Sequence, residues 1–240
     1  MPRNDDVKQD HPAPSAPGQM HKPAHAIPAL DSHPAAPASV GGHPPGPGRD
    51  EHLAEHLISS ETLFDGDFLQ ARRDQVRLPD GSVGIREYVV HPGAVVVVAL
   101  TDDDAVVVVR QYRYPVAQVM LEFPAGKLDA GESPLACGQR ELQEETGLRA
   151  SEWAYAGALH LAIGYSTEII HIYFARGLTQ GLQNLDEGEI LDVHTLRVSE
   201  VMAACRNGGI TDAKTLTCAL WLQNVQSETW SLDWVPTRDV

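Results

Sequence analysis

Hydrophobic and polar positions alternate with the short period of β-strands over much of the chain. Segments 68–78 and 83–90 alternate in polarity around Pro79-Asp80-Gly81, which predicts a hairpin with its turn at that tripeptide. Two Val-rich runs, 94–100 and 105–110, are continuously apolar up to Arg110 and are joined by an acidic turn. Continuous runs of this length are typical of strands buried on both faces of a central sheet.

The rest of the pattern predicts further strands and helices. Strands are expected near 119–123, 153–161, 168–175 and 190–198. Helices are expected at 134–146, 200–206 and 212–223. Because strands and helices are mixed along one chain, the fold class predicted is an α/β sandwich.

The N-terminal region differs in composition from the rest of the chain. The first 50 residues hold 11 of the 17 prolines and 5 of the 11 histidines, with almost no large apolar side chain. Such a segment cannot bury enough apolar area to offset the entropy of ordering it. We therefore expect a disordered Pro/Ala/His-rich tail at 1–54, a β-hairpin subdomain at 57–90 and a larger domain at 91–230.

Charge and cysteine content exclude several classes of protein. The 18 basic and 33 acidic residues give a formal net charge of −15, whereas binding to a nucleic-acid backbone needs clustered Lys and Arg. The apolar runs are far shorter than the roughly 20 residues of a membrane-spanning helix. Three cysteines without CxxC spacing indicate neither a disulfide framework nor a zinc site. We expect a soluble, cytoplasmic protein with no nucleic-acid or membrane partner.

The helix expected at 134–146 carries the candidate chemistry. Ser133 and Gly147 are residue types that begin and end helices. Three carboxylates lie close together on it and repel one another: Glu141, Glu144 and Glu145. Mg²⁺ or Mn²⁺ would offset this repulsion, since such ions take oxygen ligands and sit between carboxylates and substrate phosphates. From the helix alone, a solvated acidic face is the alternative.

The spacing of residues 126–148, GKLDAGESPLACGQRELQEETGL, goes beyond an acidic helix. It matches every specified position of the pattern GX5EX7REUXEEXGU, in which U is a bulky aliphatic residue. A chance match in a chain of this length is on the order of 10⁻⁷. In this region the chain resembles the Nudix hydrolase family. The resemblance implies a Nudix α/β/α sandwich with a mixed central sheet, plus a small N-terminal antiparallel β subdomain.

The resemblance also implies a metal site on and beside the helix. Glu141 and Glu145, with Glu144 assisting, would hold Mg²⁺, or Mn²⁺ in its place. The backbone carbonyl of Ala125 would complete the set of ligands. The residues with orienting roles would be Glu132 and Arg140.

Segments outside the motif resemble the ADP-ribose pyrophosphatase branch of this family. They are RQYRYP at 110–115, LEFPAGKLDAGE at 121–132, GYSTE at 164–168, LDEGEILDV at 185–193 and the hairpin region 78–100. The resemblance implies that Arg113 contacts the pyrophosphate, since a guanidinium offers fixed bidentate donors. Glu168 would lie near the terminal ribose, and Arg86 would reach the substrate from the hairpin subdomain. From the residues alone, a surface salt bridge is the alternative for Arg113.

The catalytic base of this branch comes from an acidic loop beyond the motif. That loop holds Asp186, Glu187 and Glu189 here, and we expect Glu187 to be the base, with Glu189 as the alternative. One position departs from the branch, because many ADP-ribose-selective members have a proline where this chain has Ile163.

Together the residues and the resemblance predict metal-dependent hydrolysis of ADP-ribose to AMP and ribose 5-phosphate. Ile163 motivates an alternative substrate, another nucleoside diphosphate sugar or a dinucleotide. A catalytically silent nucleotide-sensing Nudix module is a second alternative, but such sensors usually degrade the motif or append a DNA-binding domain. We also expect a homodimer, since the family's hairpin subdomain crosses between subunits. Residues 57–90 carry too few large apolar side chains to form a core alone.

Overall fold

The computed structural model describes residues 50–66 and 68–237. The tail expected at 1–54 therefore lies outside the described residues, except for its last five positions. These include the 3-10 turn η1 (Glu51–Leu53), which is exposed. Within the described part, no helix has the length and apolar character needed to cross a membrane.

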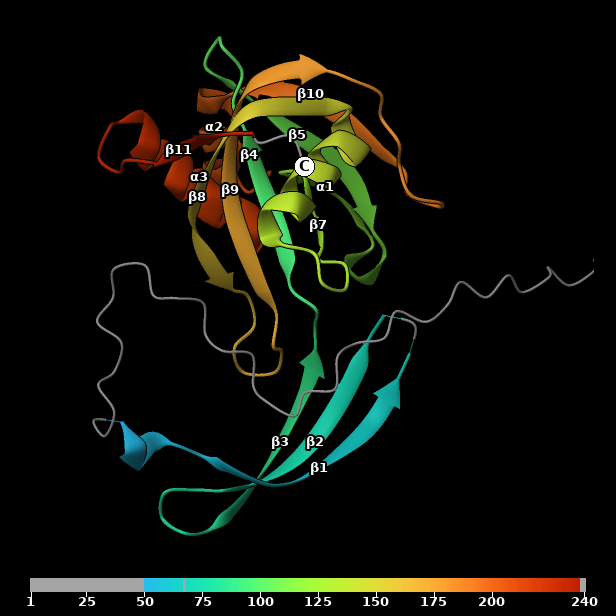
Figure 1. The fold of residues 1–240 in the computed structure, drawn as a ribbon, viewed down its shortest axis with the longest axis vertical. Coiled ribbons are helices and arrows are strands. Elements are labelled where there is room, and N and C mark those ends of the chain that lie inside the picture. Colours follow the sequence, from blue (N-terminus) through green and yellow to red (C-terminus); the bar gives the residue numbers. More distant parts are fainter. Residues whose placement is uncertain (1–49, 67, 238–240) are drawn as a thin grey trace, which may run out of the picture.

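A small antiparallel sheet forms the N-terminal part. Its strands are β1 (His56–Asp65), β2 (Gln70–Arg77) and β3 (Val83–Val90), in that spatial order. The predicted hairpin corresponds to β2 and β3, and Gly81 in its turn has a φ of 84°, which favours glycine. Figure 1 shows this sheet extending away from the body of the molecule, which it joins through β3 and β4.

The central sheet has five strands and is mixed. Its order is β11 (Trp234–Pro236), β8 (Leu148–His160), β9 (Ile169–Gln180), β4 (Ala94–Ala99) and β7 (Ala125–Lys127). The pair β4 and β9 is parallel, whereas the other pairs are antiparallel. The prediction of a mixed central sheet is thus confirmed.

A second sheet contains β10 (Leu191–Arg197), β5 (Ala105–Arg113) and β6 (Gln118–Glu122), with the 3-10 turn η2 (Tyr114–Val116) between β5 and β6. The two Val-rich runs, expected together in one central sheet, therefore lie in different sheets. The polarity pattern cannot tell one shared sheet from two separate sheets. It reports only burial, and both β4 and the first part of β5 are buried. A single bridge between Leu100 and Val106 connects them.

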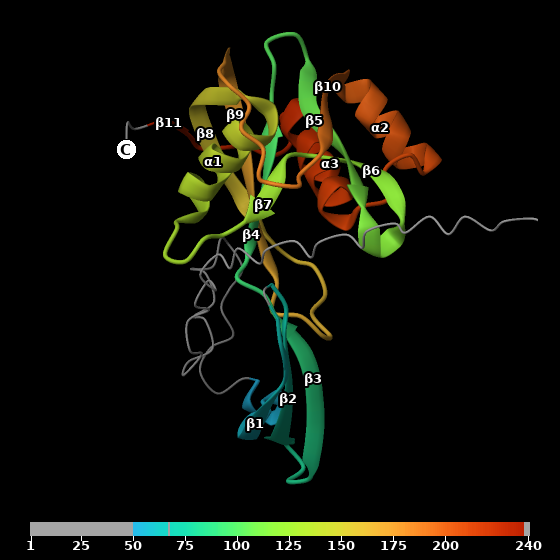
Figure 2. The ribbon, with the colours of Figure 1, turned by 90° about the vertical axis from the view of Figure 1, so that its right-hand side faces the viewer.

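Three helices complete an α/β/α sandwich: α1 (Pro134–Thr146), α2 (Val198–Asn207) and α3 (Ala213–Gln226). Alternate positions of β4 face two different cores. Val95 and Val97 pack on the side of α1, whereas Val96 and Val98 pack on the side of α2 and α3. Figure 2 shows α1 on one side of the sheets and α3 on the other.

Candidate active site

Helix α1 begins and ends where its residue types predict. The Ser133 hydroxyl accepts a hydrogen bond from the Ala136 amide at 3.2 Å, and Gly147 closes the helix with a φ of 73°. Gly138 and Leu142 are buried on the face that packs on the central sheet. This packing fixes the rotation of the helix and sets Glu141 and Glu145 beside β7.

Glu141 and Glu145 meet the backbone of β7 at two neighbouring residues. Glu145 is 2% exposed, and its Oε2 accepts a hydrogen bond from the Ala125 amide at 3.1 Å. The Glu141 carboxylate lies against Gly126, where a Cβ would fall 1.8 Å from Oε1. Only glycine at 126 leaves this space open.

Burial makes the charged form of both carboxylates unfavourable. Burial raises the pKa of Glu145 to about 8, and the negative charges of Glu141 and Glu189 add to the shift. Burial also raises the pKa of Glu141, although Arg140 opposes the shift. A cation bound between these groups would reverse this penalty.

Arg140 joins the remaining acidic residues of the motif. Its guanidinium bonds both oxygens of Glu132 at 2.9 Å, Glu141 at 2.7 Å and Glu144 at 2.9 Å. The hydrogen bonds that Arg140 donates to Glu132 are the main reason that the pKa of Arg140 is raised. Glu132 and Arg140 therefore occupy positions from which they can orient the carboxylates of the helix. Glu144 is turned toward Arg140 rather than toward β7.

The residues around Gly126 fit a hard divalent cation. Glu141, Glu145 and the Ala125 carbonyl would supply oxygen ligands, the type that Mg²⁺ and Mn²⁺ take in proteins. Because Gly126 has no Cβ, the Glu141 carboxylate can lie beside the strand that carries Ala125. In residues 50–66 and 68–237 no three His, Cys, Asp or Glu side chains are already arranged as a metal cluster. The fit thus depends on two carboxylates and a backbone oxygen.

A cavity of about 990 Å³ lies beside these groups. It brings together residues that are far apart in the chain and that the sequence singles out separately. Those residues are Arg113, Ala125, Glu141, Glu168, Asp186, Glu187 and Glu189.

Arg113 lies in the cavity wall and pairs with a buried carboxylate. Its Nε and Nη2 donate to the two oxygens of Glu122, each at 2.8 Å, and Lys214 bonds the same carboxylate. Glu122 is 2% exposed, so Arg113 does not form an ordinary surface salt bridge. Neither Glu122 nor Lys214 was expected as a functional residue. The signal available in the sequence is a lone charge inside the apolar strand 119–123; no spacing relates it to Lys214, 92 residues further on.

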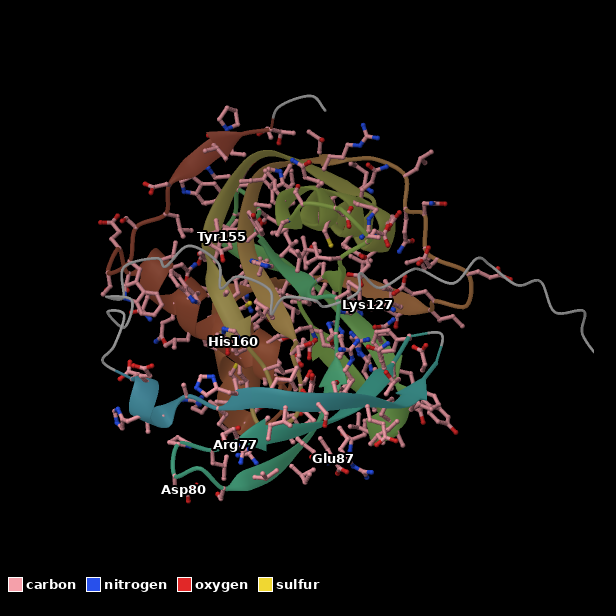
Figure 3. The ribbon with its side chains drawn as sticks, turned by 60° about the horizontal axis from the view of Figure 1, so that its bottom comes forward. Arg77, Asp80, Glu87, Lys127, Tyr155 and His160 are labelled. Atoms are coloured by element: carbon pink, nitrogen blue, oxygen red, sulfur yellow. The ribbon has the colours of Figure 1, made fainter. Side chains whose placement is uncertain are left out.

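Another wall of the cavity places Glu168 in an aromatic setting. The carboxylate lies 3.7 Å from His91, whose pKa is lowered by burial. Phe68 packs edge-on against His91, and the Lys127 ammonium lies 4.1 Å from the centre of the Phe68 ring. Figure 3 shows Lys127 in the body, behind the small sheet that carries Arg77 and Glu87. Phe68 and His91 were not expected at the site.

The acidic loop between β9 and β10 reaches the cavity. Glu189 accepts a hydrogen bond from the side-chain amide of Gln111 at 3.1 Å, and both Glu187 and Glu189 line the cavity. Arg86 lies elsewhere: on β3 it donates to Glu55 at 2.8 Å and is not among the described residues that line the cavity. Within one chain, the structure thus groups every expected substrate-contacting residue except Arg86.

The fold and the cavity define the class of protein, an α/β/α sandwich whose glutamate-rich helix presents carboxylates beside a strand. A model of the NUDIX domain matches residues 90–216, and a model of the nucleoside diphosphate sugar hydrolase N-terminal domain matches residues 55–89. The chain belongs to the NUDIX family.

Curated relatives and a solved structure support this assignment. A methanol dehydrogenase activator of Bacillus methanolicus is 38% identical over 70% of this chain and 92% of its own length. An ADP-ribose pyrophosphatase of Bacillus subtilis is 35% identical over 71% and 94%, and one of Mycobacterium tuberculosis is 46% identical over 53% and 64%. A crystal structure of an ADP compounds hydrolase has a TM-score of 0.65 at 23% identity, covering 73% of this chain and 95% of that one. This last likeness concerns the fold.

Proposed function

We propose that the protein hydrolyses the pyrophosphate of ADP-ribose to AMP and ribose 5-phosphate with the help of a divalent metal ion. The observation that carries this is a single cavity in which Glu141 of the NUDIX helix, Arg113 and the acidic loop meet. The names of two relatives, both ADP-ribose pyrophosphatases, support ADP-ribose as the substrate.

Each group in or beside the cavity has a role that its chemistry suits. Glu141, Glu145 and the Ala125 carbonyl would hold Mg²⁺ or Mn²⁺, which when bound offsets pyrophosphate charge and lowers the pKa of a bound water. Arg113 binds the pyrophosphate through its guanidinium. Glu187 takes the proton from the attacking water, and Glu189 is the alternative base. Glu168 contacts the terminal ribose.

Substrate and reaction are tested together by comparing ADP-ribose with ADP-glucose, NADH and diadenosine diphosphate, each with Mg²⁺ and with EDTA. We expect metal-dependent cleavage of ADP-ribose with the highest kcat/KM. Ile163, the departure from the ADP-ribose branch, is 84% exposed and is not among the described residues that line the cavity. A tenfold or greater preference for another compound would move the substrate to that compound, whereas no cleavage of any would favour the sensor.

Glu145→Gln tests the metal site. The amide keeps the size of the side chain and an oxygen to accept the Ala125 N–H, but it removes the charge. We expect kcat to fall by about a hundredfold or more, because the ligand charge acts on the transition state. The melting temperature of the metal-free protein should be kept or raised, since the glutamine, unlike the buried carboxylate, need not take up a proton on folding. Glu152→Gln, which alters an exposed carboxylate paired with Arg176, is the control. Near-normal activity of Glu145→Gln would refute these ligands.

We also propose that the protein is a homodimer formed through the small sheet. Every residue of β1 is exposed in the single chain, and Leu57, Phe64 and Ile85 are more than half exposed. Asp74 on β2 is 7% exposed, and its Oδ1 has no hydrogen-bond partner among the described residues. The register sets Leu57, Asp74 and Arg86 on one face of this sheet and Phe64 and Ile85 on the other. A second copy on the face of Leu57 would cover that side chain, and Arg86 would then have a route to the partner's cavity.

A further inference from the structure

A row of alternating charges runs from the start of α3 to the cavity wall. It begins at Asp212, whose carboxylate caps α3 by accepting hydrogen bonds from the Thr215 amide at 2.9 Å and hydroxyl at 2.6 Å. Lys214 donates to the same Asp212 oxygen at 2.9 Å and also bonds Glu122. Glu122 in turn receives Arg113. All four charged side chains line the cavity.

Lys214 stands where a cation is electrostatically unfavourable. It lies in the first turn of α3, near the positive end of the helix dipole, and its side chain is only 11% exposed. Burial of an ammonium adds a desolvation cost. The helix itself gains nothing from a lysine at this position, so the reason for it lies in the carboxylates that it contacts.

Glu122 needs more than one cation to remain a buried carboxylate. Burial pushes its pKa upward, but the hydrogen bonds from Arg113 and the charge of Lys214 bring that pKa below its ordinary value. Lys214 shares Oε2 with Arg113, whereas Oε1 is bonded by Arg113 alone. The carboxylate is thus fixed from two sides, by strand β5 and by helix α3.

Only part of the Arg113 guanidinium is used by the Glu122 carboxylate, and the rest is free to bind a group in the cavity. Nε and one N–H of Nη2 are taken by Glu122, and in residues 50–66 and 68–237 the remaining donors make no hydrogen bond. Of its five donors, three are therefore left on the edge formed by Nη1 and Nη2. That edge can bind a phosphate group in a bidentate manner, provided that Glu122 holds the other edge still.

We propose that Lys214 is a positioning residue for substrate binding, which holds Glu122 in place and through it sets Arg113 for the pyrophosphate. This inference rests on the proposed function, in which Arg113 contacts the pyrophosphate. Lys214 also offsets the Glu122 charge, so that Arg113 keeps its attraction for an anion in a cavity whose other charged residues are mostly acidic.

A double-mutant cycle on ADP-ribose hydrolysis with Mg²⁺ tests the inference. Its four enzymes are the wild type, Lys214→Met, Arg113→Ala and the double variant. We expect Lys214→Met to raise KM about tenfold with a smaller change in kcat, and to change KM by less than about twofold when Arg113 is already absent. Lys214→Arg should recover most of the affinity, because it restores a cation for Glu122.

Lys127→Met is the matched control, since Lys127 lines the same cavity but does not bond Glu122. The factor by which Lys127→Met changes KM should be the same with and without Arg113→Ala, so that the two factors multiply in the double variant. If thermal melting shows that Lys214→Met is unfolded, the cycle is made with Lys214→Gln, which can still donate to Glu122; we expect about a threefold rise in KM that again vanishes without Arg113.

Two outcomes separate the inference from the function on which it rests. An active wild type in which the Lys214 and Arg113 effects multiply, or in which Lys214→Met leaves KM unchanged, would overturn the positioning role alone. A wild type that cleaves no ADP-ribose would overturn both proposals.

Discussion

Gly126 fits the site because it lacks a side chain. A Cβ there would lie 1.8 Å from Oε1 and 1.9 Å from Cδ of Glu141, well inside any allowed contact. The backbone of Gly126 is not in the left-handed region, so the limit comes from the carboxylate and not from the φ angle. One added methyl group would therefore act on Glu141 directly.

Gly126→Ala should lower kcat by about a hundredfold, because the Glu141 carboxylate must move by more than an ångström and such displacements have effects of this size. Stability should change little, since the atoms that must shift belong to the end of a flexible side chain. Gly164→Ala is the matched control, because a Cβ at 164 would meet nothing within 4 Å. Steady-state kinetics with Mg²⁺ and a thermal melt measure both effects; an active Gly126→Ala enzyme would show that Glu141 does not work from this position.

Arg140 illustrates how charges on one element can balance without a metal. The three carboxylates of α1 repel one another, and the sequence alone predicts an external cation to offset this. Arg140 already bonds Glu141 and Glu144, so those two have a partner within the protein. Among the residues that the structure describes, Glu145 has no such cation in contact, and burial governs its pKa. Among the helix carboxylates, Glu145 therefore has the most to gain from a bound ion.

At the scale of elements, residues close in the chain predict where a helix begins and ends, whereas the sequence does not predict which strands pair. Ser133 and Gly147 mark the ends of α1 through hydrogen bonds and a backbone angle that involve only near neighbours, so the sequence predicts this helix to the residue. The separation of β4 and β5 into two sheets depends on which strands pair with each, and a buried Val run reads the same in either sheet. Polarity patterns therefore predict which strands are buried better than they predict the order of the strands in a sheet.

In the site, too, the sequence predicts groups that are close in the chain and misses contacts between distant residues. The motif from Gly126 to Leu148 could be identified because its residues are close in the chain and its spacing is fixed. Glu122 and Lys214 are 92 residues apart and meet only because α3 packs beside β6, so no spacing in the sequence relates them. The roles of Arg113, Glu168 and Glu187 came from family resemblance, and the structure adds that all three border one cavity.

For the whole molecule, the small sheet is the part through which the proposed homodimer would form. Figure 3 labels Arg77 and Glu87 on this sheet, and Figure 1 shows the sheet extending away from the body. One side of it is held by charges, since Arg73 bonds Glu87 at 2.7 Å and approaches Glu61 at 3.9 Å. Leu57 lies opposite Val76 on the other side and is 61% exposed. Apolar exposure on an isolated three-stranded sheet is costly unless another surface covers it.

Leu57→Ser should therefore weaken the homodimer. In a symmetric interface each substitution acts twice, and the loss of two buried leucine side chains is about 3 kcal/mol or more, which corresponds to a dimer dissociation constant raised by two orders of magnitude or more. Sedimentation velocity over a concentration series measures this constant. Leu220→Ser, which alters a 52% exposed leucine on α3, is the matched control and should leave the association unchanged. A wild-type protein that sediments as a stable, active monomer would contradict the dimer, whereas a dimer that Leu57→Ser does not weaken would place the interface on another face.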